Sequence, residues 1–199
     1  MKFMESFPET VEIDGVDYRI DSDFRTSIRF EVFIQDAEDD EKIVLELLRL
    51  YYGEEIPPNI TKAVEKALWF YSGGDVKKKS GTPSDTQRPQ PYSFEHDWNY
   101  IYSAFLEQFG IDLQEGSMHW WKFRALFQSL SDKTKFSEIV CYRTVKLSQV
   151  PKEQRDFYRK MKKLYALPKS DKEEELMKNI RDRLRNGENI EEVFEGGQN

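Results

Sequence analysis

The side chains in this sequence best suited to chemistry are two histidines and one cysteine. His96 lies between Glu95 and Asp97, and carboxylates beside an imidazole can raise its basicity or help it bind a metal. Adjacent helix residues do not face each other, so an exposed histidine in a first helical turn is the simpler interpretation. His119 has no second histidine within one turn, and the chain has no HExxH or CxxC pattern. We therefore predict no metal site, no cofactor and no catalytic residue.

A glycine pair followed by lysines gives a superficial likeness to a phosphate-binding loop. The pair is Gly73-Gly74, and the segment 77–80 reads Lys-Lys-Lys-Ser. The Walker pattern requires glycine directly before Lys-Ser, and Lys78 takes that position, so we favour a solvated loop. Cys141 is the single cysteine and has no motif partner, which predicts an unreactive thiol in a reducing compartment.

The charges are distributed unevenly along the chain. Residues 31–55 hold nine acidic and two basic residues, and residues 152–163 hold six basic and two acidic residues. Opposed charges of this kind steer partner proteins or pair within a fold, although solvated helix faces are the more ordinary explanation. Arg155, Arg159 and Lys163 are our candidates for partner binding in the basic segment.

Overall composition limits the function classes. A chain of 199 residues forms one domain or one domain with an appendage, and its net charge of −7 disfavours nucleic acid as a partner. No apolar run is long enough to cross a membrane, and the N-terminus does not read as a signal peptide. We expect a protein of the cytoplasm that has no membrane partner.

Hydrophobic spacing predicts a mostly α fold, a multi-helix globular bundle with a small N-terminal β-hairpin. The hairpin is expected over 10–20 around Asp14-Gly15, a pair suited to a type I′ turn. Helical spacing then predicts helices starting near Ser22 or Asp23, Asp39, Asn59, Tyr92, Ser117 and Phe157, while 136–142 is ambiguous between helix and strand.

The domain organisation follows from composition. Residues 1–168 form one helical domain, which contains a polar segment over 74–91 that we expect to be a mobile loop. Residues 169–199 read as a charged C-terminal helix and a flexible tail.

Aromatic residues gather in the second half of the chain, and most of them are expected in the core. Trp120 and Trp121 are adjacent, so on a helix their side chains point about 100° apart. Both are buried only if a broad face of the helix is covered. We therefore expect one of the two to be exposed and to anchor a partner protein, because tryptophan dominates interface hot spots.

Several segments together resemble the gene-fifteen product family of siphophages and prophages of Gram-positive bacteria. The resemblance covers about residues 7–168, and the run from His119 to Leu126 is its most specific part. The segments that carry it are Asp23–Arg25, Ile28–Glu31, Ala67–Tyr71 with Gly73, Phe94–Asp97, Tyr100–Phe105, His119–Phe127 and Lys160–Pro168.

The resemblance implies a tail-assembly chaperone that acts in the host cell cytoplasm without catalysis. Its implied partners are the tape-measure protein, which it keeps soluble, and the tail-tube protein, which it recruits. A co-chaperone encoded next to it and self-association both stay open. Two other classes also stay open: a tail completion or connector protein that remains in the virion, and an enzyme whose polar cleft a sequence does not reveal.

Overall fold

The chain begins with the β-hairpin that the sequence predicts. In this computed structural model, which describes residues 6–36, 40–74 and 91–168, β1 (Thr10–Ile13) pairs antiparallel with β2 (Val16–Arg19). Asp14 and Gly15 have φ values of 53° and 80°, the two positive values that a type I′ turn needs. Val11 and Ile13 are buried, and β1 packs against the third helix of the chain.

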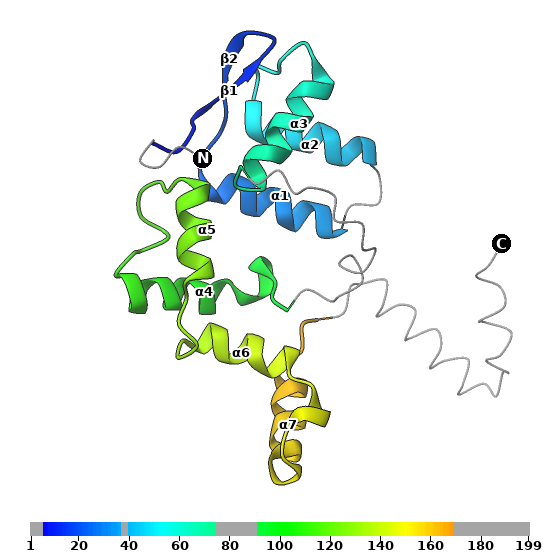
Figure 1. Ribbon diagram of the computed structural model, residues 1–199, viewed down its shortest axis with the longest axis vertical. Coiled ribbons are helices and arrows are strands. Elements are labelled where there is room, and N and C mark those ends of the chain that lie inside the picture. The colour runs from blue at the N-terminus through cyan, green and yellow to red at the C-terminus, as the bar shows by residue number, and fades with distance from the viewer. Residues whose placement is uncertain (1–5, 37–39, 75–90, 169–199) are drawn as a thin grey trace, which may run out of the picture.

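Three helices follow the hairpin close to the predicted positions. They are α1 (Phe24–Asp36), α2 (Asp40–Tyr52) and α3 (Ile60–Tyr71), and α2 packs against both of the others (Figure 1). The side chain of Asn59 caps α3 by accepting a hydrogen bond from the backbone N–H of Lys62. The Tyr52 hydroxyl donates to the carbonyl of Ala63 at 2.9 Å, which fixes the end of α2 on α3.

The second half of the chain contributes α4 (Phe94–Phe109), α5 (Trp120–Gln128) and α6 (Lys135–Thr144). Gly110 ends α4 in the left-handed conformation, as its position after the apolar stripe predicts. The ambiguous segment 136–142 is helical, because Thr134 caps it and Phe136, Ile139 and Tyr142 are buried at helical spacing. α6 packs against α4.

The expected cap of α5 at Ser117 is wrong. The helix begins at Trp120, and its N-cap is His119, whose Nδ1 accepts a hydrogen bond from the Trp121 N–H at 3.0 Å. The residues before α5 are extended instead, since they pair with the chain ahead of α1. An isolated antiparallel bridge joins Asp23 to His119, with the Trp120 N–H donating to the Ser22 carbonyl at 2.7 Å.

A stack of three phenylalanines joins the two halves. The ring of Phe123 on α5 lies 4.8 Å from that of Phe24 on α1 and 5.0 Å from that of Phe105 on α4, nearly parallel to both. Phe105 and Phe123 are fully buried, as expected for most of the aromatic residues in the second half of the chain. This stack lies where α1, α4 and α5 meet, so it is the centre of the bundle.

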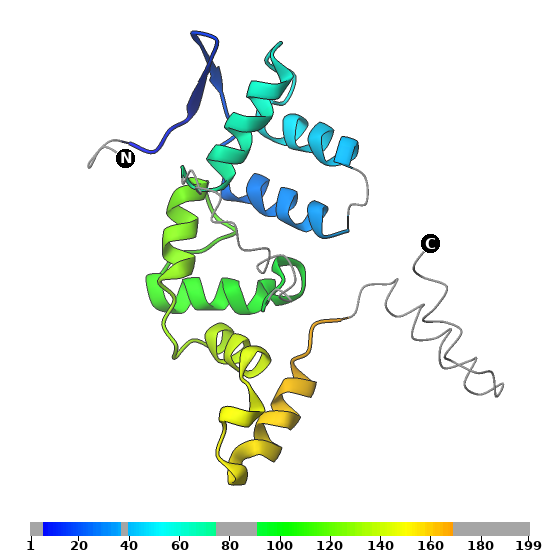
Figure 2. The ribbon, with the colours of Figure 1, turned by 45° about the vertical axis from the view of Figure 1, so that its right-hand side comes forward.

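The last described helix, α7 (Arg155–Leu164), lies at one end of the molecule (Figures 1 and 2). Two 3₁₀ turns, η1 (Leu147–Gln149) and η2 (Lys152–Gln154), lead to it, and it packs against these turns and α6. None of its residues is buried. The mostly α fold with an N-terminal hairpin is therefore confirmed, while residues 75–90 of the expected loop and the expected helix and tail over 169–199 lie outside the described residues.

Candidate functional site

The two adjacent tryptophans are both core residues, so the expectation that one of them is exposed is wrong. Trp120 is 3% exposed and Trp121 is 9% exposed. Both can be buried because α5 is covered on a broad face, with Trp120 stacked on Tyr71 and Trp121 packed between Trp69 and Phe70. Neither indole offers a surface to a partner.

The indole N–H groups show what these tryptophans do. The Nε1 of Trp121 donates to the Phe70 carbonyl and the Nε1 of Trp120 donates to the Tyr71 carbonyl, both at 2.8 Å. Both carbonyls lie in the last turn of α3, where a helix supplies no further backbone N–H groups to its carbonyls. Gly74 follows with a φ of 78°, and a Cβ there would lie 2.7 Å from the Trp121 ring. The pair therefore fastens the end of α3 to α5.

His119 also has a structural role. Its Nδ1 accepts from the Trp121 N–H, so this nitrogen carries no proton in the observed geometry. The proton is then on Nε2, which donates to the Pro8 carbonyl at 3.0 Å. The ring also stacks on Phe7 with a centroid distance of 4.9 Å. The imidazole thus holds the segment ahead of β1 against α5.

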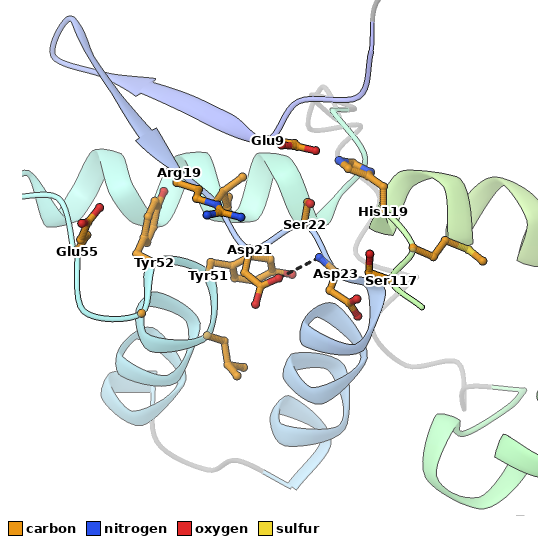
Figure 3. A pocket seen from close by; sticks show the side chains of 14 residues that line it. Glu9, Arg19, Asp21, Ser22, Asp23, Tyr51, Tyr52, Glu55, Ser117 and His119 are labelled. Atoms are coloured by element: carbon orange, nitrogen blue, oxygen red, sulfur yellow. Dashed lines mark hydrogen bonds between the residues drawn. The ribbon is translucent and has the colours of Figure 1, made fainter. Parts of the chain in front are cut away.

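One cavity, of about 720 Å³, lies between the base of the hairpin, the end of α2 and the approach to α5 (Figure 3). Among its polar side chains, Asp21 and Tyr51 form hydrogen bonds within the fold. Asp21 accepts from the Asp23 N–H and from the Thr26 hydroxyl, both at 2.9 Å. Asp23 in turn caps α1, since its Oδ1 accepts from the Arg25 N–H at 2.8 Å. Burial raises the pKa of Tyr51, whose hydroxyl bonds that of Ser27 at 2.7 Å.

A second cavity, of about 530 Å³, is walled mostly by aromatic residues of α3, α4 and α5. Glu31 is buried beside it and accepts a hydrogen bond from the Tyr71 hydroxyl at 3.0 Å. Burial first, and then the charge of Glu31, raises the pKa of Tyr71. Glu31 belongs to the acidic segment 31–55 in sequence, but its side chain is buried inside the fold.

Metal-binding clusters do not occur within 6–36, 40–74 and 91–168, where no three histidine, cysteine, aspartate or glutamate side chains are grouped to hold an ion. His96 is exposed in the first turn of α4, as the simpler interpretation predicts, and Cys141 is an exposed free thiol.

The structure places the three basic candidates on α7 but gives them different surroundings. The Arg155 side chain points back toward the residues that precede α7, where its Nε donates to the Val150 carbonyl at 2.9 Å. Arg159 forms an exposed ion pair with Asp156, and Lys163 is exposed near the end of the helix. Only Arg159 and Lys163 therefore present charge outward.

The apolar side of α7 is the feature that the site prediction missed. Phe157 is 50% exposed and Leu164 is 66% exposed, although both belong to the apolar stripe that predicts this helix. Lys160 is three residues after Phe157 and four before Leu164, so the three side chains are neighbours on one helix face. Tyr142 of α6 contacts Phe157 and Tyr165 at the edge of that stripe and leaves the rest uncovered. A sequence signal existed, since Phe157, Met161 and Leu164 recur at helical spacing in a segment whose other residues are mostly charged.

A family model described as bacteriophage Gp15 protein matches residues 3–167. The chain belongs to the Gp15 family of bacteriophage proteins. The match spans the hairpin and all seven helices of the described fold. No curated protein and no solved structure matches the chain. None of the helices among the described residues is long and apolar enough to cross a membrane.

In this Gp15 protein, two of the sequence segments that are rich in aromatic residues contact each other. Ala67–Tyr71 forms the end of α3, and His119–Phe127 forms the cap and body of α5. Their contact is made by the indole hydrogen bonds and by the stacking of Tyr71 on Trp120 at 5.8 Å. The segment that looked most specific in sequence therefore maintains the fold, and α7 is the described surface best suited to a partner.

Proposed function

We propose that this Gp15 protein is a tail-assembly chaperone that binds the tape-measure protein of its phage in the host cytoplasm and acts without catalysis. Family membership supports a bacteriophage protein, and the observation that carries the finer proposal is the exposed apolar stripe of α7. We further propose that the bound complex recruits tail-tube subunits.

The chemistry of α7 suits a long helical partner. Phe157 and Leu164 lie seven residues apart on one face, which is the spacing at which an amphipathic helix meets another helix. A tape-measure protein that is not yet enclosed by the tail tube exposes apolar stripes along its helices. Covering such stripes removes apolar surface from water, and the lysines around the α7 stripe keep the complex solvated.

The test is co-expression of the tape-measure protein with this protein, followed by solubility and co-purification measurements. The unchanged protein is expected to make the tape-measure protein soluble and to purify with it. Leu164→Ser should weaken capture by about tenfold or more, as expected for a side chain at the centre of an interface. The matched control is Leu45→Ser on α2, because Leu45 is 67% exposed and the chemical change is the same.

Two results would overturn the proposal. One is a tape-measure protein that stays equally insoluble with and without this protein, with no complex isolated. The other is detection of this protein in purified virions at a stoichiometry of a structural part, which would favour a tail completion or connector protein instead.

A further inference from the structure

We infer that free copies of this protein associate head to tail, with α7 of one copy seated on the end of the next copy that carries the hairpin and the start of α3. This inference rests on the proposed function, because it says what covers the α7 stripe before the tape-measure protein arrives. The partner surface is therefore a second copy of this chain.

The hairpin tip and the start of α3 form one continuous end of the molecule. Asp14 in the hairpin turn accepts a hydrogen bond from the Asn59 side chain at 2.8 Å and pairs with Lys62. Three exposed apolar side chains belong to this end, namely Val16, Ile56 and Ile60. We call it the hairpin end, defined by residues 12–19 and 54–65.

The hairpin end and α7 have opposite charge. Residues 12–19 and 54–65 hold six acidic and two basic residues, a formal charge of −4. Residues 152–163 hold six basic and two acidic residues, a formal charge of +4. Each surface also has exposed apolar side chains, so their contact combines apolar burial with charge complementarity. Two copies of α7 would instead bring like charges together, which disfavours a symmetric α7–α7 dimer.

The positions of the two surfaces determine the kind of assembly. The hairpin end lies at one extreme of the long axis and α7 at the other (Figures 1 and 2). The two surfaces of one copy therefore do not meet each other, and each must be covered by a different neighbour. A contact between two different surfaces continues from copy to copy and gives a chain or a closed ring.

This arrangement also regulates the proposed binding site. The exposed faces of Phe157 and Leu164 are covered by the neighbouring copy while no tape-measure protein is present. A tape-measure helix that binds α7 more tightly than the hairpin end does would displace the neighbour, because both occupy the same stripe. Self-association and capture then compete for one surface.

The test uses charge reversal with rescue, measured on the full chain by sedimentation velocity over a range of concentrations. The unchanged protein is expected to form concentration-dependent oligomers that weaken as salt rises, because screening reduces the attraction between exposed charges. Lys160→Glu and Glu55→Lys should each weaken association by about tenfold or more. Combining both changes in one chain should restore it, since each altered surface again meets its opposite charge.

The outcomes separate this inference from the proposed function. A monomer at every concentration, or a double variant that associates no better than the single ones, would overturn the inference. Loss of association in Leu164→Ser with association retained in Leu45→Ser would support it. If the oligomers form as expected but the tape-measure protein is not captured, the proposed function fails and the inference stands as self-association alone.

Discussion

The Arg143 guanidinium holds the carboxylate of Asp97 with both of its terminal nitrogens. The Nη2–Oδ1 distance is 2.8 Å, and the two side chains are 12% and 1% exposed. The same guanidinium donates through Nη1 to the Pro91 carbonyl at 3.2 Å and through Nε to the Tyr165 carbonyl. One side chain of α6 thus binds the start of α4 and the residue that follows α7.

Replacing Arg143 should lower the free energy of unfolding by far more than the loss of one exposed charge would. Arg143→Met leaves Asp97 buried without its ionic partner, which typically lowers the free energy of unfolding by about 3–5 kcal/mol. Urea denaturation measures this loss. Lys135→Met is the control, because it breaks the exposed pair with Glu138 and should cost at most about 1 kcal/mol. Equal losses in the two variants would contradict the role of the buried pair.

Truncation of the central stack should be among the most damaging changes in the core. Phe105→Ala and Phe123→Ala are each expected to lower the free energy of unfolding by about 3–5 kcal/mol, the range for a buried phenylalanine. The same change in the half-exposed Phe157 should have a clearly smaller effect on global unfolding. A loss below about 1 kcal/mol at Phe123 would show that the stack does not stabilise the fold.

The buried tryptophans should affect stability and leave capture unchanged. Trp121→Phe removes the hydrogen bond to the Phe70 carbonyl, which keeps a second donor in the Gly73 N–H at 3.0 Å. We therefore expect a cost of at least about 1 kcal/mol in chemical denaturation. Tape-measure capture below the unfolding transition should match that of the unchanged protein. A loss of capture without a loss of stability would show that the Trp121 indole does contact the partner.

Stability should decline at alkaline pH because of the buried tyrosines. Burial raises the pKa of Tyr52 to about 12, whereas a tyrosine in the unfolded chain titrates near 10. Below pH 10 both states hold the proton. Between about pH 10 and 12 only the unfolded chain releases it, so the free energy of unfolding falls as pH rises. Tyr52→Phe should reduce that slope, and an unchanged slope would mean that other groups cause the decline.

The order of elements was predictable because it depends on local spacing. Apolar residues at helical intervals predicted α1 to α5 and α7, and Asp14-Gly15 predicted the hairpin turn. The start of α5 was missed, since it depends on a bridge between Asp23 and His119, which are far apart in the chain. Pattern methods have no access to such a contact before the fold is known.

The site was harder to predict than the fold, for a physical reason. Tryptophan suits both cores and interfaces, so the types of Trp120 and Trp121 do not indicate whether they are exposed. What decides their burial is the end of α3, whose carbonyls accept both indole protons. The stripe of α7 was visible in sequence, but its exposure depends on how little of it α6 covers.

The extended contact between the starts of α1 and α5 also constrains how the chain acquires its structure during synthesis. Phe24 leaves the ribosome almost a hundred residues before Phe123, the ring on which it stacks at 4.8 Å. Until that ring and the strand-like pairing at His119 are available, α1 to α3 lack one wall of their core. The first half of the nascent chain therefore keeps apolar surface exposed until α5 has been translated. Folding of the bundle is completed only after that point.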